Sequence, residues 1–178
     1  MNRQELIEKL YKAHNSFLDY MMSLSDEEFN LRYNNKWSAS QQLEHINLCL
    51  KPLIKIYSYP KIIIRIIFGK TNRNSKPYDL FIAKYEERVA KGTNPPGRFL
   101  PKGINIEREA QVKGLTYSLN KLCNQVSGFT ERQLDKLIMP HPMFGKVTMR
   151  EMLYFTIHHV KHHEEITKRN LRKEENPV

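Results

Sequence analysis

Hydrophobic side chains recur at helical spacing over most of this chain. In residues 3–22 the apolar positions lie three and four apart, which places them on one face of an α-helix. Stripes of the same period run over residues 39–57, from about 105 to 126, and from about 148 onward. Strand-like alternation is nearly absent. The pattern predicts four long helices, each with one apolar face, and therefore an all-α bundle.

Two of the predicted helices begin with capping signals. Ser38 is followed three residues later by Gln41, and Thr148 is followed three residues later by Glu151. A hydroxyl at the first position of such a pair accepts a hydrogen bond from an amide that the helix leaves without a partner. The longer side chain at the third position reaches back in the same way. These pairs fix where the second and fourth helices start.

The second and third long helices are separated by a long irregular stretch, residues 61–105. It contains a short apolar segment, a candidate short helix over residues 80–89, and the breaker cluster Gly-Thr-Asn-Pro-Pro-Gly at residues 92–97. A loop is expected over residues 139–146. We therefore predict a four-helix bundle with a long crossover connection, formed by residues 1–178 as a single domain. Long connections in small domains often cover a site.

Composition places the chain among ordinary globular proteins. Hydrophobic residues make up 40% and charged residues 27% of the 178 positions. No apolar run approaches the roughly 20 residues of a membrane span. The N-terminal residues turn amphipathic at once, without the apolar core of a signal peptide. A cytoplasmic location, with no membrane partner, is the expectation.

The two cysteines, Cys49 and Cys123, each lie on an apolar helical stripe. Neither has the spacing of a zinc knuckle or a redox pair, so buried free thiols are expected. The net charge is +10, but the basic residues are spread along the chain without a DNA-reading motif. Nucleic acid is therefore not an expected partner. One hypothesis for the basic residues Lys70 and Arg73 is that they attract an anionic substrate.

Four of the seven histidines fall in one short run, His158-His159-Val160-Lys161-His162-His163. Histidines four apart on a helix lie on one face, where two imidazoles can share a divalent metal. The run contains two such pairs. It is equally compatible with a surface histidine cluster that has no physiological metal.

Helical phase favours the pair His159 and His163 as metal ligands. Their line continues through the apolar residues Met152 and Ile166. The other pair lies on a polar line that is expected to face solvent, formed by Tyr154, His158, His162, Glu165 and Arg169.

A third ligand would have to come from another helix, and His45 borders the apolar stripe of the second one. The set His45, His159 and His163 would leave coordination positions open for water or substrate, as catalytic metal sites do. His162 and His141 are candidates for supporting contacts around these ligands.

Three segments resemble one known family. Residues 35–45, Asn-Lys-Trp-Ser-Ala-Ser-Gln-Gln-Leu-Glu-His, resemble the tryptophan-serine opening and first metal histidine of the DinB/YfiT-like superfamily. Residues 141–148 and 154–163 resemble its loop and last helix. The resemblance implies a four-helix bundle with ligands His45, His159 and His163 for a divalent ion, commonly nickel or zinc, and often a homodimer. Family members include metal-dependent hydrolases and transferases that use low-molecular-weight thiols.

The resemblance leaves the reaction open. No catalytic residue is assigned, and neither Glu44 nor Glu164, which adjoin the ligands in sequence, is identified as a general base. The expected function is a metal-dependent hydrolase or low-molecular-weight-thiol S-transferase acting on a small molecule. The alternative is a non-catalytic metal- or ligand-binding bundle with a regulatory role.

Overall fold

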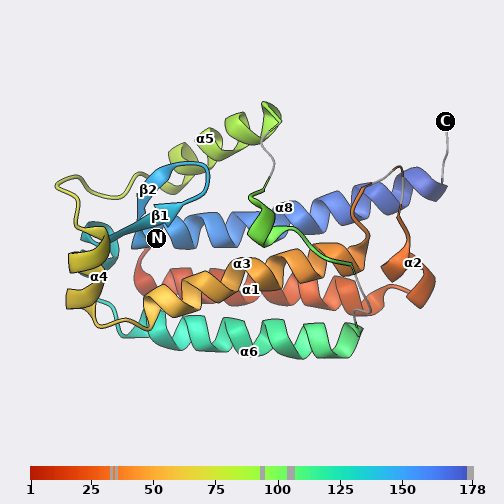
Figure 1. Ribbon diagram of the computed structural model, residues 1–178, viewed down its shortest axis with the longest axis horizontal. Coiled ribbons are helices and arrows are strands. Elements are labelled where there is room, and N and C mark those ends of the chain that lie inside the picture. The colour runs from red at the N-terminus through yellow and green to blue at the C-terminus, as the bar shows by residue number, and fades with distance from the viewer. Residues whose placement is uncertain (33, 35, 93–94, 104–106, 176–178) are drawn as a thin grey trace.

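A computed structural model describes residues 1–32, 34, 36–92, 95–103 and 107–175. Four long helices form the body of the molecule (Figure 1), namely α1 (Arg3–Ser23), α3 (Ala39–Tyr57), α6 (Arg108–Ser127) and α8 (Met149–Glu175). They coincide with the four predicted apolar stripes. The predicted start of the third long helix near residue 105 lies outside the described residues.

Shorter elements connect the long helices. In chain order they are α2 (Asp26–Asn30), α4 (Lys61–Phe68), α5 (Tyr78–Ala90), the 3-10 helix η1 (Gly97–Phe99), α7 (Glu131–Lys136), β1 (Ile138–His141) and β2 (Gly145–Thr148).

Both capping predictions are confirmed. The Ser38 hydroxyl accepts from the amide of Gln41 at 3.3 Å, and the Gln41 carbonyl oxygen accepts from the Ser38 amide at 3.1 Å. Thr148 and Glu151 form the same reciprocal pair at 3.1 Å and 2.9 Å. Helix α3 continues through Pro52 to its end at Tyr57. Local sequence therefore sets the start of both helices that carry the candidate ligands.

The direction of the long helices explains the crossover. In Figure 1, α1 and α8 run from the end marked N toward the end marked C, whereas α3 and α6 run back. Helix α3 packs against α6, α1 packs against α8 and α6, and α3 also contacts α8. Because α3 and α6 run in the same direction, the connection between them, described over residues 58–92 and 95–103, returns along the bundle. The all-α bundle with a long crossover is thus confirmed.

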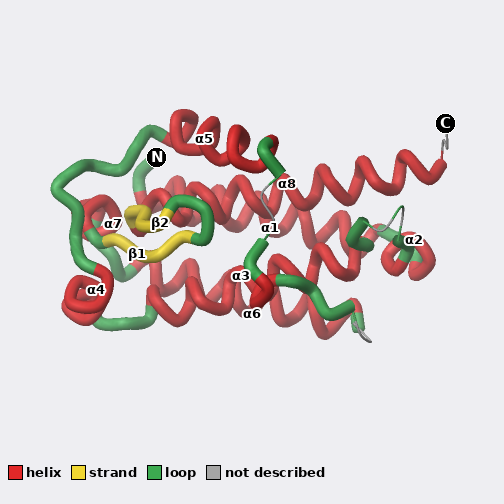
Figure 2. The backbone as a smooth tube through the Cα atoms, turned by 45° about the horizontal axis from the view of Figure 1, so that its top comes forward, coloured by secondary structure: helices red, strands yellow, loops and turns green. Residues whose placement is uncertain are grey.

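The segment expected to be a loop over residues 139–146 is instead part of a β-hairpin. Strands β1 and β2 pair antiparallel from Ile138 opposite Thr148 to His141 opposite Gly145. Figure 2 shows the hairpin beside the start of α8. Strands of four residues are too short for an alternating pattern to stand out in the sequence. Their inward side chains, Met139 and Val147, are almost fully buried.

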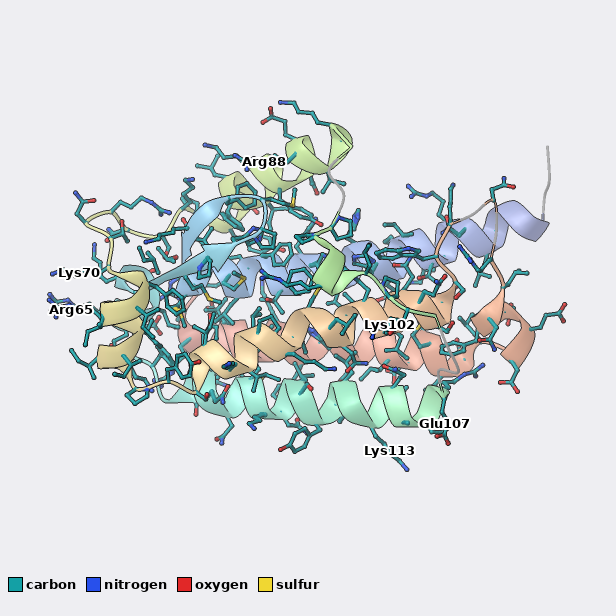
Figure 3. All side chains as sticks on the ribbon, in the orientation of Figure 1. Arg65, Lys70, Arg88, Lys102, Glu107 and Lys113 are labelled. Atoms are coloured by element: carbon teal, nitrogen blue, oxygen red, sulfur yellow. The ribbon has the colours of Figure 1, made fainter. Side chains whose placement is uncertain are left out.

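The apolar faces of the long helices form one hydrophobic core. Its largest fully buried side chains include Phe17, Tyr57, Phe81 and Phe129. Charged side chains such as Lys113 and Glu107 point away from the bundle in Figure 3. Among the described residues, no helix is long and apolar enough to cross a membrane.

Candidate metal centre

Helix α3 carries His45 just inside the bundle. The side chain is 2% exposed and lies two turns after the Ser38 cap. The Trp37 ring covers it, with ring centroids 5.0 Å apart, and is stacked at 6.4 Å from His163. The tryptophan of the family-like opening therefore shields two candidate ligands from solvent.

Helix α8 carries His159 and His163 one turn apart on the face toward α3. Their side chains are 8% and 7% exposed. The helix start is held by Glu151, whose carboxylate forms a bidentate ion pair with Arg73 at 2.6 Å and 2.8 Å. The face of α8 that carries His159 and His163, predicted from the helical period, is therefore the face turned toward the bundle interior.

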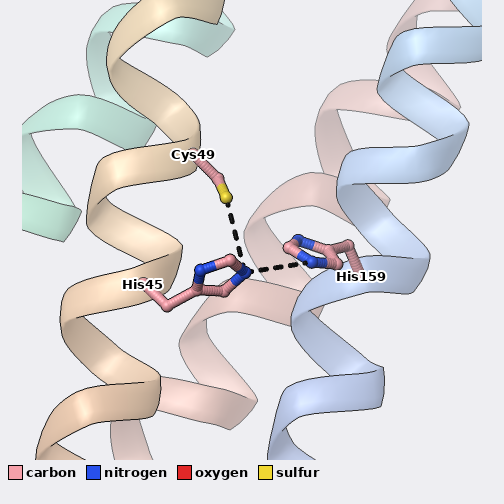
Figure 4. Close-up of side chains that lie close together, drawn as sticks. All are labelled: His45, Cys49 and His159. Atoms are coloured by element: carbon pink, nitrogen blue, oxygen red, sulfur yellow. Dashed lines mark hydrogen bonds between the residues drawn. The ribbon is translucent and has the colours of Figure 1, made fainter. Parts of the chain in front are cut away.

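The three imidazoles meet through the same type of nitrogen. His45 Nε2 lies 3.4 Å from His159 Nε2, and His163 Nε2 lies 3.0 Å from His159 Nε2. The ring centroids of His45 and His163 are 4.6 Å apart. Figure 4 shows the contact between the rings from α3 and α8. Side chains 114 residues apart in sequence are therefore brought within ligand-sharing distance.

The opposite ring nitrogens are held by hydrogen bonds. His45 Nδ1–H donates to the carbonyl oxygen of Phe99 at 2.7 Å, and His163 Nδ1–H donates to Gln42 Oε1 at 2.5 Å. A proton on Nδ1 leaves a lone pair on Nε2 when the ring is neutral. Both Nε2 lone pairs therefore face the shared space, which is the arrangement that metal-ligating histidines adopt.

Burial disfavours the protonated form of these rings. Loss of hydration lowers the pKa of His45, and it lowers the pKa of His159 and His163 well below the usual value. Neighbouring imidazoles lower the pKa of His159 and His163 further, because two adjacent positive rings repel. A neutral imidazole is the form that binds a metal.

Cys49, which was expected to be a buried free thiol, lies beside these rings. Its Sγ is 3.6 Å from His45 Nε2 (Figure 4). One donor atom from each of His45, Cys49 and His159 lies within 4.8 Å of the other two, a group that could hold a metal ion. Burial raises the pKa of the thiol to about 12. The sequence did contain a sign of this proximity, because Cys49 lies four residues after His45 and therefore on the same helix face.

Two nitrogen separations and the donor chemistry fit a tetrahedral metal ion. Nitrogens bonded to zinc at 2.0–2.1 Å in a tetrahedron would lie about 3.3 Å apart. The two Nε2–Nε2 separations of 3.4 Å and 3.0 Å are close to that value. Imidazole and thiolate suit zinc, nickel and copper, whereas magnesium and calcium prefer oxygen ligands.

A pocket of about 580 Å³ opens onto the three rings. Its walls are mainly apolar and come from α3, α5, η1, the β-hairpin and α8, with Leu53, Ile56 and Met143 among them. Lys51 and Arg98 also line it, and no Asp or Glu does so within the described residues. The crossover and the hairpin thus form the walls of a chamber above the histidines.

His141 and His162 both line this pocket. His141 is 4% exposed, its Nδ1 accepts from the Met143 amide at 3.1 Å, and its Nε2 has no hydrogen-bond partner among the described residues. Burial lowers the pKa of His141 to about 4. His162 is half-buried, with its ring 5.4 Å from that of His163. Their supporting role stays a prediction.

The part of the predicted solvent-facing line of α8 nearest the helix start is covered, whereas Glu165 and Arg169 are exposed as predicted. Tyr154 is 4% exposed, and the ring of His158 packs edge-on against Tyr85 of α5 at 5.4 Å. His158 Nε2 also lies 3.4 Å from a carboxylate oxygen of Glu86. Helix α5 belongs to the crossover, so its position over α8 is a long-range feature that periodicity does not reveal.

Four charged residues singled out in the sequence lie outside the pocket lining, and the attraction of an anionic substrate by Lys70 and Arg73 stays a prediction. Arg73 is engaged with the buried Glu151, so it anchors α8, and neither Lys70 nor Arg73 lines the pocket. The carboxylates that adjoin the ligands are engaged as well: Glu44 accepts from the Gly103 amide at 3.0 Å, and Glu164 accepts from Ser16 Oγ at 3.1 Å. These contacts give all three side chains structural roles.

Comparison with known proteins agrees with this architecture. The family model of the DinB superfamily matches residues 9–166. The chain is also similar to the uncharacterized protein YuaE of Bacillus subtilis (strain 168), with 24% identity over 147 residues, covering 80% of this chain and 83% of that protein. No solved structure matches.

Proposed function

Because the chain belongs to the DinB superfamily, we propose that it is a divalent-metal-dependent enzyme whose ligands are His45, His159 and His163. The proposed metal is zinc or nickel. The proposed reaction is hydrolysis of a small molecule or transfer of a low-molecular-weight thiol to it. The observation that carries the proposal is the convergence of three buried Nε2 atoms beneath an open pocket. One hydrophobic core shared by all four long helices supports a single domain over residues 1–178.

A bound divalent metal would supply a coordinated hydroxide or thiolate as nucleophile at neutral pH. The protein's own contribution is orientation and exclusion of water. The Phe99 carbonyl and Gln42 hold two of the rings with Nε2 toward the shared space. Trp37 shields the ligands on one side. These contacts would fix the ligand geometry before substrate enters.

The pocket lining supports a substrate class. Apolar walls favour a mainly apolar molecule, and the cations Lys51 and Arg98 favour an anionic group on it. We expect Arg98→Ala to raise KM several-fold for an anionic substrate and to leave kcat unchanged. The lost contact would stabilise the bound substrate and the transition state equally. An equal KM in both proteins, or a fall in kcat alone, would contradict this assignment.

The alternative, a non-catalytic metal-binding bundle, is favoured by one observation. Cys49 lies close enough to the histidines to supply a fourth protein ligand. Four protein ligands are typical of structural zinc sites, whereas catalytic sites keep a position open. The open pocket above the rings favours the enzyme.

The test begins with protein purified without a histidine tag. Elemental analysis is expected to find about one zinc or nickel ion per chain. The loaded protein is then screened with thiols plus electrophiles, and separately with esters and amides. Turnover should disappear on chelation and in His159→Ala but persist in His158→Ala, the matched substitution one residue away. Absence of stoichiometric metal, or turnover that survives chelation, would contradict the proposal.

We also propose a homodimer, following the family resemblance. Helix α4 supports a contact surface of this kind, because four of its side chains are exposed and apolar, Ile62, Ile63, Ile66 and Ile67. Sedimentation equilibrium should show a dimer for the wild type and a shift toward monomer for Ile66→Glu. A monomeric wild type at micromolar concentration would exclude the homodimer.

A further inference from the structure

The candidate centre is built from two matching helical pairs. On α3, His45 and Cys49 lie four residues apart, and on α8, His159 and His163 have the same spacing. Residues four apart share a helix face. The face of α3 that presents His45 therefore presents Cys49 as well, and Figure 4 shows both on the side of α3 toward His159.

The sulfur lies close to two of the three proposed histidine ligands, His45 and His159. In a tetrahedron with metal–sulfur and metal–nitrogen bonds of about 2.3 Å and 2.05 Å, sulfur and nitrogen would lie about 3.6 Å apart. The distance from Cys49 Sγ to His45 Nε2 is 3.6 Å. His45 uses the same Nε2 toward His159, so the sulfur and both nitrogens border one common space.

The surroundings leave the sulfur accessible to an ion. Cys49 lines the main pocket, and it also lines a small cavity of about 10 Å³ together with His14 and His159. His14 is fully buried, and its Nε2 has no hydrogen-bond partner among the described residues. The space beside the sulfur therefore has polar as well as apolar walls.

We propose that Cys49 is a fourth protein ligand of the metal, so that the centre consists of three imidazoles and one thiolate. This inference rests on the proposed function in requiring that a divalent metal binds at the histidines. With four protein ligands, the nucleophile of the proposed enzyme would occupy a fifth position on the pocket side, an expansion that catalytic zinc sites can undergo. Coordination would release the thiol proton to solvent, with no change in oxidation state. A thiolate ligand favours zinc, cobalt, nickel and copper over manganese and magnesium. The competing interpretation is a thiol hydrogen bond to His45 Nε2 without a metal–sulfur bond.

Cobalt distinguishes these interpretations, because a thiolate bound to Co²⁺ adds a charge-transfer absorption in the near ultraviolet. We would load the full-length wild type, Cys49→Ala and Cys123→Ala with one equivalent of Co²⁺. Cys123 is a matched control, since it is the other cysteine and lies buried on α6. The band is expected in the wild type and in Cys123→Ala and should be lost in Cys49→Ala. We expect Cys49→Ala still to bind Co²⁺, with affinity lower by at least about tenfold.

Thiol alkylation gives a second readout that needs no substitution. Iodoacetamide labelling followed by peptide mass spectrometry is expected to show that Zn²⁺ protects Cys49 and leaves labelling of Cys123 unchanged. Two results would overturn the inference while leaving the proposed function intact. One is a wild type that binds Co²⁺ without the charge-transfer band. The other is a band that persists in Cys49→Ala. Failure of the wild type to bind Co²⁺ or Zn²⁺ at all would overturn the proposed function as well.

Discussion

Helix α8 carries two histidine pairs with identical spacing and different surroundings. The inner pair, His159 and His163, faces α3: His159 Nε2 meets His45 Nε2, and His163 Nε2 meets His159 Nε2. The outer pair, His158 and His162, faces α5, where its neighbours are Tyr85 and Glu86. A rotation of about 100° around one helix separates the two environments. Spacing alone therefore does not define a metal site; the side chains on the facing helix do.

Substitution of a ligand should separate the pairs most strongly. His159→Ala, His163→Ala or His45→Ala would each remove one of three converging nitrogens, and we expect metal affinity to fall by more than about 100-fold. His158→Ala should stay within a factor of about three, because its ring contacts Tyr85 and Glu86. Competition titration with a chromophoric chelator measures both. Equal losses in the two sets of variants would abolish the distinction between inner and outer pairs.

The next largest effect is expected from Gln42, which holds a ring of the inner pair. Gln42→Leu removes the acceptor for His163 Nδ1–H and frees the ring to rotate or change tautomer. Metal affinity should fall about 10- to 100-fold, in the range seen when partners of metal ligands are removed. The same titration measures it, with circular dichroism to confirm the fold. Unchanged affinity would show that the side-chain contact does not orient the ligand.

Acid should affect the two pairs in a definite order in metal-free protein. Burial lowers the pKa of the inner rings well below the usual value, and lowers that of His158 while the Glu86 carboxylate opposes the shift. As pH falls from 7, NMR titration of the imidazoles should therefore show His158 protonating before His159 and His163. Simultaneous protonation would contradict the difference in environment.

The same pKa shifts predict the pH dependence of stability. A ring whose pKa is lower in the folded state binds its proton more readily once the chain unfolds. The free energy of unfolding of the metal-free protein should therefore be largest above about pH 6.5 and fall as pH decreases below it. His159→Gln should flatten this fall more than His158→Gln, measured by urea denaturation at several pH values. Greater flattening by His158→Gln would contradict the account.

The smallest effect is expected from the partner of the outer pair. Glu86 is 63% exposed at its side chain, and its carboxylate lies 3.4 Å from His158 Nε2. Glu86→Ala should change the free energy of unfolding by less than about 0.5 kcal/mol and leave metal affinity unchanged. Thermal denaturation and the chelator titration measure the two quantities. A loss of metal binding would place Glu86, and with it the outer pair, in the metal centre.

Local chemistry explains what the sequence could predict. The caps at Ser38 and Thr148 involve residues three apart, and the phase that separates His159 from His158 follows from the period of a single helix. Both features are contained in short stretches of chain. The four long helices and the inward orientation of His159 and His163 could therefore be predicted from the sequence.

Features that depend on distant segments were not predictable in this way. The Phe99 carbonyl reaches His45 only because the crossover returns along α3, where the Gly103 amide is bound by Glu44. The cover of α5 over His158 and the short hairpin have the same origin. Cys49 was treated as core because an apolar stripe does not show that its sulfur lies beside His45.

Anomalous diffraction from crystals of tag-free, metal-loaded protein tests the central claim most directly. Data collected on both sides of the absorption edge of the metal would locate the ion independently of any substitution. We predict one peak within bonding distance, about 2.0–2.2 Å, of Nε2 in His45, His159 and His163. A peak at His158 and His162 instead, or no peak between the three inner rings, would contradict it.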